Sequence, residues 1–226
     1  ETSFDGRDGA WRTRCEAGAL HDLVLAGIPV PQVYECFSVS GNSYLAIEDI
    51  EGEVLQDLLV DHRLKPNEAV RRATQMAGVV ADIHAAGWVW RDCKPANFIA
   101  DTSLSLRPID FEGSCRLGEQ QDTEWASPGY LPPEGLAGPA SESGDLYALG
   151  ASMHQLLTGS IINEMPLTSL AEMRPEVPAE VSFVVNSLLS KDPSRRRPAT
   201  WAQQELLQFQ HHASEARSTE AFPLSA

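Results

Sequence analysis

The ten residues Trp88–Asn97 read WVWRDCKPAN and place an Asp, a Lys and an Asn at intervals of two and three residues. The preceding stretch, Asn67 to Ala86, carries apolar residues at i, i+3 and i+4 spacing, which predicts a long helix. Two short apolar runs, 98–100 and 104–109, follow the loop and predict a small hairpin that ends at Asp110. The fold is therefore expected to hold a polar loop between a helix and a hairpin.

The side chains of this loop have the chemistry of phosphoryl transfer. Asp92 can accept the proton of an incoming hydroxyl group, and Lys94 can neutralise charge that builds on a transferred γ-phosphate. Magnesium takes oxygen ligands and needs few protein ligands beside phosphate oxygens, so Asn97 and Asp110 suffice to bind it. We therefore expect Asp92 and Lys94 to be catalytic and Asn97 and Asp110 to hold a metal ion.

Composition limits the partners of the chain. Its 226 residues include 17 basic and 32 acidic residues, a formal net charge of −15, with an ordinary globular share of 42% apolar residues. This acidic excess argues against nucleic acid and anionic membranes as partners, because binding either of them needs Lys and Arg. No apolar run approaches the ~20 residues that span a bilayer. A reducing compartment, the cytoplasm, is expected because the cysteines are scattered without metal-ligand spacing: Cys15, Cys36, Cys93 and Cys115.

The remaining pattern predicts strands early in the chain and helices late. A helix is expected over 8–26, and Ser40-Gly41-Asn42 separates two β-rich runs, 33–39 and 43–50, as in a hairpin. The last dozen residues are expected to be frayed. Five other segments are predicted, namely a short helix at 54–60, an irregular loop at 111–138, and helices at 145–157, 179–189 and 200–211. This order predicts an α+β architecture with a small sheet and a larger helical part.

Several further motifs follow the loop in a fixed order. Asp110-Phe111-Glu112-Gly113 is similar to D-F-G with a Glu inserted, and Pro132-Pro133-Glu134 is similar to A-P-E. Ser127-Pro128-Gly129-Tyr130 is similar to G-T-P-x-Y. The segments 144–150 and 191–198 are similar to D-V-Y-S-L-G and D-P-x-x-R-P. With Arg91, Asp92, Lys94 and Asn97 matching H-R-D-x-K-x-x-N, and Trp90 replacing the His, residues from about 10 to 210 resemble the eukaryotic-like Ser/Thr protein kinase superfamily.

The resemblance implies a bilobal fold with a truncated N-lobe. Residues 1–50 would form a partial N-lobe with a small antiparallel sheet and the C-helix, 51–212 a mainly helical C-lobe, and 213–226 a tail. Glu16 would be the ion-pairing Glu of the C-helix, with a solvated helix carboxylate as the other interpretation of this residue. Arg197 would pair with Glu134.

The resemblance also implies a nucleotide, ATP or GTP, together with Mg²⁺. Ile47 would lie near the gatekeeper position, and the backbone of Glu48 and Ile50 would face the adenine. Lys94, Asn97 and Asp110 would lie at the phosphates and the metal. A protein or peptide substrate would accept the phosphate on Ser or Thr.

One part of the family pattern is missing from the sequence. No Gly-rich loop precedes Glu16, and no lysine occurs before Lys65. The expectation is that both elements lie upstream of Glu1 in a longer parent chain, and that this chain alone binds nucleotide weakly. Two alternatives stay open: a pseudokinase or scaffold that lacks the ATP-anchoring Lys, and a small-molecule phosphotransferase of the aminoglycoside type.

A narrower resemblance rests on three short motifs. Asp5-Gly6-Arg7-Asp8, the W-R-D-x-K-P-x-N loop and Ile109–Gly113 look like the kinase domains of class III and class IV lanthipeptide synthetases. In those multidomain bacterial enzymes the kinase phosphorylates Ser and Thr of a precursor peptide, which implies lyase and cyclase domains of a larger parent as partners. A stand-alone bacterial kinase with the same motifs fits nearly as well.

Four residues near the loop depart from the family pattern or stay open in their role. Trp90 is expected to pack in an apolar spine, and Cys93 to be a buried neutral thiol rather than a redox sensor. Glu112 could contact metal or the C-helix, although a local loop adjustment is the simpler expectation. Arg91 is expected to bind an acidic group of the following loop, for which the candidates are Glu119, Asp122, Glu124 and phosphorylated Thr123.

Overall fold

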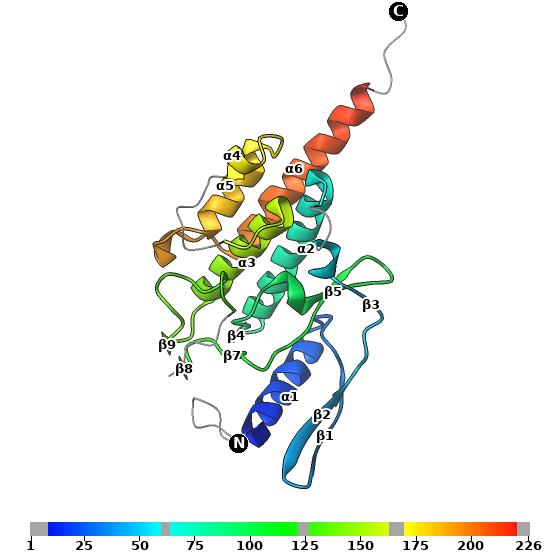
Figure 1. The fold of residues 1–226 in the computed structure, drawn as a ribbon, viewed down its shortest axis with the longest axis vertical. Coiled ribbons are helices and arrows are strands. Elements are labelled where there is room, and N and C mark those ends of the chain that lie inside the picture. The colour runs from blue at the N-terminus through cyan, green and yellow to red at the C-terminus, as the bar shows by residue number, and fades with distance from the viewer. Residues whose placement is uncertain (1–8, 60–63, 122–126, 163–169, 221–226) are drawn as a thin grey trace, which may run out of the picture.

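A computed structural model gives the structure of the chain at residues 9–59, 64–121, 127–162 and 170–220, with side chains described up to residue 213. Figure 1 shows a smaller part, made of α1 and the β1–β2 hairpin, beside a larger part built from helices. Within the described residues, none of the helices combines the length and the apolar character that crossing a bilayer requires. The two parts share one core, because Leu20 and Leu23 of α1 pack in the same buried cluster as α2 and α3.

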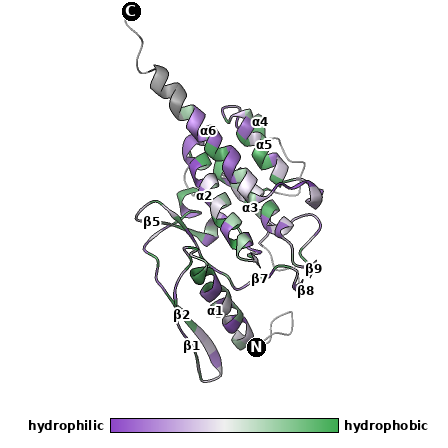
Figure 2. Ribbon diagram, turned by 180° about the vertical axis from the view of Figure 1, so that it is seen from behind, coloured by the Kyte–Doolittle hydropathy of each residue, from purple (hydrophilic) through white to green (hydrophobic). Residues whose placement is uncertain are grey.

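The smaller part has the elements that the sequence predicts. Helix α1 (Gly9–Leu25) is followed by strands β1 (Val33–Val39) and β2 (Asn42–Ile47), which pair antiparallel. The turn between them forms at Ser40 and Gly41, which both have positive φ angles (52° and 83°), as a tight hairpin turn requires. In Figure 2 the hydrophobic residues of α1 gather at the end nearest the helical part, while the other end is mostly hydrophilic.

The segment after the hairpin corrects one expectation. Instead of a helix over 54–60, the chain forms strand β3 (Gly52–Val54) and only a short 3-10 turn η1 (Asp57–Leu59). Val54 lies opposite Ile99, and the Leu55 N–H donates to the Phe98 carbonyl (2.9 Å). Pairing with a neighbouring hairpin therefore overrides the local helical pattern, which tertiary contacts commonly do.

Short strands surround the predicted polar loop. Strands β5 (Phe98–Asp101) and β6 (Leu106–Pro108) form the expected hairpin and join β3 in a three-stranded sheet of order β3-β5-β6. The predicted irregular region 111–138 holds further short strands, each of two residues. Strand β7 (Cys115–Arg116) pairs with β4 (Trp88–Val89), which precedes the polar loop. Strand β8 (Gln120–Gln121) pairs with β9 (Gly138–Pro139). The polar loop thus leaves β4 and enters β5 through the short turn η2 (Pro95–Asn97).

Helices form the larger part. Helix α2 (Pro66–Ala85) packs against both α3 (Glu142–Thr158) and α6 (Ala199–Glu220), and its Ala73, Ala77 and Val80 are buried at helical spacing. Helix α5 (Ala179–Leu188) packs closely against α3. At the contact, Gly150 of α3 lies against Leu188 of α5, and a Cβ added to Gly150 would come within 2.8 Å of the Leu188 Cβ. The turn η3 (Pro193–Arg195) and the short helix α4 (Leu170–Met173) complete the described elements of this part.

The end of the chain differs from its prediction. Helix α6 continues to Glu220, beyond the predicted end at 211, so residues 215–220 are helical rather than frayed. The last six residues lie outside the described part of the chain. The observed architecture is α+β, with a small antiparallel hairpin and one helix beside a mainly helical part, as a truncated bilobal fold requires.

Candidate active site

A buried carboxylate on α3 holds the loop that begins at Trp90. Asp145 is fully buried and accepts hydrogen bonds from the backbone N–H groups of Trp90 (2.8 Å) and Arg91 (2.6 Å). The His84 Nε2 atom, from the end of α2, lies 3.0 Å from the same carboxylate. The Asp145 carboxylate thus holds the backbone at Trp90 and Arg91 in one place, and His84 of α2 holds the carboxylate. Together, α2 and α3 therefore fix the position of the next residue, Asp92.

The Asp92 carboxylate lies at the centre of a closed hydrogen-bond network. Lys94 Nζ donates to Asp92 Oδ2 (2.6 Å) and to Ser127 Oγ (2.6 Å), and the Ser127 hydroxyl donates to Asp92 Oδ1 (3.0 Å). Asn97 Nδ2 donates to the carbonyl (2.9 Å) and to Oδ2 (2.8 Å) of Asp92. The structure therefore brings together the three predicted loop residues, and it adds Ser127, which the sequence marks only as part of a G-T-P-like motif.

Trp90 fills the space beneath this network. Its side chain is fully buried, stacks on Phe111 with ring centroids 5.3 Å apart, and meets Phe98 edge-on at 5.1 Å. The indole N–H donates to the Asp110 carbonyl (2.8 Å), so the tryptophan also ties the loop to the end of the hairpin. Cys93 is fully buried as well, and burial first, then the charges of Asp145 and Asp92, raises the pKa of its thiol. Both residues behave as expected, one as packing and one as a neutral thiol.

The β5–β6 hairpin carries Asp110 to the site. The Ile109 N–H donates to the Asn97 carbonyl (2.9 Å), so Asn97 and Asp110 lie at the same end of the hairpin. Asp110 has a φ angle of 64° and Arg91 one of 71°, a left-handed conformation that is uncommon outside glycine and tends to occur at functional sites. The Asp110 residue is exposed at its surface, but partial desolvation of its carboxyl, followed by repulsion from Asp92, raises its pKa above the ordinary value.

These residues fit a magnesium ion. Asn97 uses its amide nitrogen on Asp92, which leaves its side-chain oxygen for another partner. The Asp110 carboxylate lies where extra positive charge would stabilise it, since both burial and Asp92 disfavour its ionised form. One amide oxygen and one carboxylate are the kind of oxygen set that magnesium shares with phosphate oxygens.

Glu16 reaches the same region from α1. Its carboxylate accepts a hydrogen bond from the Phe111 N–H (3.3 Å), directly beside Asp110. Burial raises the pKa of Glu16, and the charges of Asp110 and Glu112 act in the same direction, although the Phe111 bond opposes them. The structure therefore brings this helix carboxylate to the start of the D-F-E-G segment rather than leaving it in solvent.

The predicted adenine-facing residues lie beyond β2. The Glu48 N–H donates to the Gln32 carbonyl (2.8 Å), and its carboxylate pairs with Arg107 of β6 at 2.6 and 2.8 Å. Ile50 is buried. The side chain of Glu48 is thus engaged with the β5–β6 hairpin, which leaves only its backbone for the predicted contact with the adenine.

The geometry corrects the expected partner of Glu134. Glu134 pairs with Arg196, not with Arg197: both Arg196 Nη atoms donate to its carboxylate, one of them at 2.7 Å. Arg197 instead is exposed and lies over the Trp201 ring. The difference arises because Arg196 turns inward and also donates to the Ser143 carbonyl (2.9 Å), which is the start of α3.

Two further expectations concern Glu112 and Arg91. Glu112 contacts the C-helix through Arg12 (3.0 Å), which selects this possibility over a mere loop adjustment. The Arg91 side chain donates to Gln121 Oε1 (3.2 Å), a neutral residue that the sequence did not single out. Glu119 bonds the Arg116 N–H (3.1 Å) instead. The other three candidates for Arg91, at 122–124, fall outside the described residues.

Comparisons with known proteins agree with this geometry. A family model described as the protein kinase domain matches residues 24–208. CBL-interacting serine/threonine-protein kinase 24 of Arabidopsis thaliana is 29% identical over 182 residues, covering 74% of this chain and 41% of that protein. Probable serine/threonine-protein kinase PknB of Lactococcus lactis is 28% identical over 172 residues, covering 68% of this chain and 27% of that protein. Serine/threonine-protein kinase PrkC of Bacillus subtilis is 27% identical over 186 residues (74% and 29%). The chain thus spans less than half the length of these relatives.

Proposed function

Because the chain belongs to the protein kinase family, we propose that its site transfers the γ-phosphoryl group of a magnesium nucleotide to a Ser or Thr hydroxyl of a protein or peptide. The observation that carries this proposal is the closed network around Asp92. A carboxylate only accepts hydrogen bonds, and Lys94, Asn97 and Ser127 hold this one by donating to it. The carboxylate is therefore set in one orientation before a substrate arrives, which is how positioned groups lower a barrier.

Each residue of the site has a separate part in this reaction. Asp92 orients the substrate hydroxyl and accepts its proton, and Lys94 offsets negative charge next to it. Asn97 and Asp110 would hold Mg²⁺, and the bound nucleotide, ATP or GTP, supplies the phosphoryl group. The backbone of Glu48 and Ile50 would face the adenine. Glu16 would position the phosphate-anchoring lysine of a longer chain.

A protein or peptide is favoured over a small molecule as the acceptor. Arg196 is buried, donates to both Glu134 oxygens and to Ser143, and so anchors the Pro-Pro-Glu segment to α3. That anchored segment lies just after Ser127, where a peptide beside Asp92 would need a platform. Small-molecule phosphotransferases of the aminoglycoside type usually lack this segment.

The narrower substrate proposal is a lanthipeptide precursor. It rests on the D-G-R-D, W-R-D-x-K-P-x-N and I-D-F-E-G motifs of the sequence. It implies that residues 1–50 and 51–212 are the partial N-lobe and C-lobe of a kinase domain within a larger protein with lyase and cyclase domains.

A pseudokinase or scaffold is the second candidate, and one observation favours it. Glu16 has a raised pKa, chiefly because of its partial burial, and residues 1–64 of this sequence contain no lysine that could pair with it. A site without that lysine would bind nucleotide weakly. The two candidates differ in one measurable quantity, the transfer of phosphate.

The test offers radiolabelled ATP and Mg²⁺ to the longest natural protein that carries these residues. One reaction contains a pool of Ser- and Thr-bearing peptides, and a second contains a pool of aminoglycosides. Label on the peptides, lost when a chelator removes Mg²⁺, is the expected result. Label on the aminoglycosides alone would reject the peptide acceptor, and bound nucleotide without any transfer would reject the enzyme in favour of the scaffold.

A further inference from the structure

A chain of three polar side chains lies beside the site around Asp92. The Tyr130 hydroxyl donates to Gln155 Oε1, and Gln155 Nε2 donates to Gln56 Oε1 (3.1 Å). Tyr130 is 7% exposed and Gln155 only 2%. A buried polar network whose members satisfy one another holds them in one arrangement. The chain therefore joins three segments that are far apart in the sequence: the turn at Tyr130, helix α3 and the residues after β3.

One end of this chain leads to the Asp92 carboxylate. The Tyr130 N–H donates to the Ser127 carbonyl (3.1 Å), which closes a tight turn. At the start of that turn, the Ser127 hydroxyl donates to Asp92 Oδ1 (3.0 Å) and accepts from Lys94 Nζ (2.6 Å). A displacement of the Tyr130 side chain would therefore move the turn and, with it, the hydroxyl that orients Asp92.

Helix α3 holds the catalytic loop as well as this turn. The Ser152 hydroxyl donates to the carbonyl of Cys93 (3.0 Å), the residue between Asp92 and Lys94. Ser152 and Gln155 are three residues apart, so they lie on the same side of α3 and about 4.5 Å apart along its axis. One rigid helix thus sets the position of the loop through Ser152 and that of the turn through Gln155.

The other end of the chain keeps the Gln155 amide oriented toward Tyr130. Gln56 follows Leu55, whose N–H donates to the Phe98 carbonyl (2.9 Å), so the pairing of β3 with β5 fixes its backbone. Gln56 occupies the nitrogen of the Gln155 amide, which leaves the oxygen to Tyr130. Burial, the largest cause, raises the pKa of Tyr130 to about 12, so its hydroxyl stays protonated and able to donate at neutral pH.

We propose that Gln155 is a positioning residue of the transfer reaction, which holds Ser127 against Asp92 through its hydrogen bond with Tyr130. Gln155 is buried, so it acts through the turn and not on the substrate. This role rests on the proposed function, because it concerns the rate of that reaction. It bears on the orientation of the base, so it should change the rate of transfer and leave the affinity for the nucleotide as it is.

The test measures the single-turnover rate of label transfer from Mg-ATP to a pool of Ser- and Thr-bearing peptides, with the natural protein that carries these residues. Gln155→Met keeps the size of the side chain and removes both hydrogen bonds. The rate at saturating Mg-ATP should fall on the order of tenfold or more, while the concentration that gives half of this rate should not change. Gln155→Glu should restore the rate, because burial favours its protonated carboxyl, whose C=O accepts from Tyr130 and whose O–H donates to Gln56.

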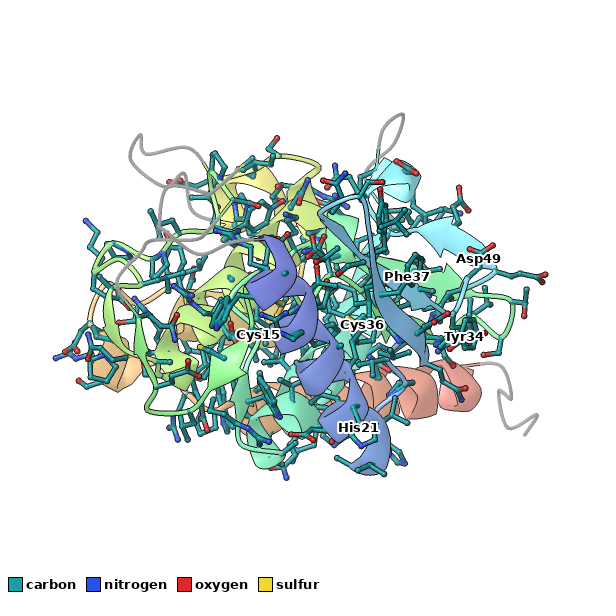
Figure 3. The ribbon with its side chains drawn as sticks, turned by 90° about the horizontal axis from the view of Figure 1, so that it is seen from below. Cys15, His21, Tyr34, Cys36, Phe37 and Asp49 are labelled. Carbon is teal, nitrogen blue, oxygen red and sulfur yellow. The ribbon has the colours of Figure 1, made fainter. Side chains whose placement is uncertain are left out.

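Two tyrosine variants provide a matched comparison. Tyr130→Phe removes only the hydroxyl and should lower the rate as Gln155→Met does, so it carries the same prediction if the Met variant does not fold. Tyr34→Phe removes the same group from a tyrosine on the β1–β2 hairpin that is 67% exposed and is labelled in Figure 3. This control should transfer label at the native rate.

A double variant separates positioning from a general loss of stability. If Gln155 acts through Ser127, adding Gln155→Met to Ser127→Ala should lower the rate no further than Ser127→Ala alone. Two losses that multiply would overturn the proposal, and so would an undiminished rate in both Gln155→Met and Tyr130→Phe. These results require a native protein that transfers label. A native protein that transfers none would instead reject the proposed function, and the role of Gln155 with it.

Discussion

Glu16 is a partly buried acid whose preferred charge state depends on its neighbours. Its carboxylate accepts one N–H group, from Phe111, and lies near two further carboxylates, Asp110 and Glu112. Burial, the largest cause, raises the pKa of Glu16 above its ordinary value of about 4.5. The surroundings of Glu16 among the described residues therefore disfavour its ionised form.

The first prediction follows from that raised pKa. Between the unfolded pKa and the higher folded pKa the native state holds more protons, so the contribution of Glu16 to stability falls as pH rises through this window. Glu16→Gln, which keeps an acceptor for Phe111, should raise the melting temperature at pH 8 and have little effect at pH 4. Thermal unfolding at both pH values measures this. A Gln variant that loses stability at pH 8 would show that the carboxylate has a cationic partner.

At the residue scale, sequence reasoning identified the polar loop but not its supports. Asp92, Lys94 and Asn97 could be recognised because phosphoryl transfer needs a carboxylate, an ammonium group and an amide close together, and their short spacing in the sequence ensures this. Ser127 and Gln121 carry no such signal, because a serine or a glutamine in a loop is common and only folding brings each to its partner. Gln121 has no charge that would mark it as a partner of Arg91, although an amide oxygen can accept from a guanidinium as a carboxylate oxygen does.

At the scale of elements, periodicity predicted the long helices and the two hairpins, because their apolar spacing is regular over many residues. It misjudged the stretch after Ile50, where Val54 pairs with Ile99 in a sheet that no local pattern reveals. The family resemblance, in turn, assigned Arg197 rather than Arg196 as the partner of Glu134. The three consecutive arginines, 195–197, are identical in sequence terms and differ only in where their side chains point, which the tertiary structure decides.

The second prediction uses that arginine run. Arg196 has a fully buried side chain that donates to both Glu134 oxygens, to Ser190 and to Ser143. Arg196→Ala should lower the free energy of unfolding by about 3 kcal/mol, because it leaves a carboxylate and two carbonyls without their donor. Arg197→Ala, at an exposed position, should cost less than about 0.5 kcal/mol. Urea denaturation of both variants provides the comparison, and similar losses would refute the assignment.

At the scale of the whole molecule, Arg107 links the two parts. From β6 it donates to both Glu48 oxygens, and to the carbonyls of Pro29 (3.2 Å) and Val30 (3.1 Å). These acceptors lie before and after the β1–β2 hairpin, so a single side chain secures both ends of that hairpin to the helical part. The position of the proposed adenine-facing segment beyond β2 thus depends on a contact with the C-lobe.

The third prediction concerns this link. Arg107→Met should speed amide hydrogen exchange in β1 and β2 several-fold, in line with a loss of roughly 1 kcal/mol for a partly exposed pair, and leave α3 unchanged. Arg71→Met provides the control, because Arg71 pairs with Glu68 within α2. Exchange that rises equally in the hairpin and in α3 would mean that Arg107 supports global stability instead.

Transfer of phosphate by the loop around Asp92 is the central claim, and one comparison tests it most directly. The measurement is the single-turnover rate of label transfer from Mg-ATP to a peptide by the natural protein that carries these residues, with and without Asp92→Asn. The substitution keeps the shape of the side chain but removes the base, so the rate should fall by about 100- to 10,000-fold. Asp82→Asn, the same change at an exposed site on α2, should leave the rate unaltered. Equal transfer by the native protein and by Asp92→Asn would contradict the account.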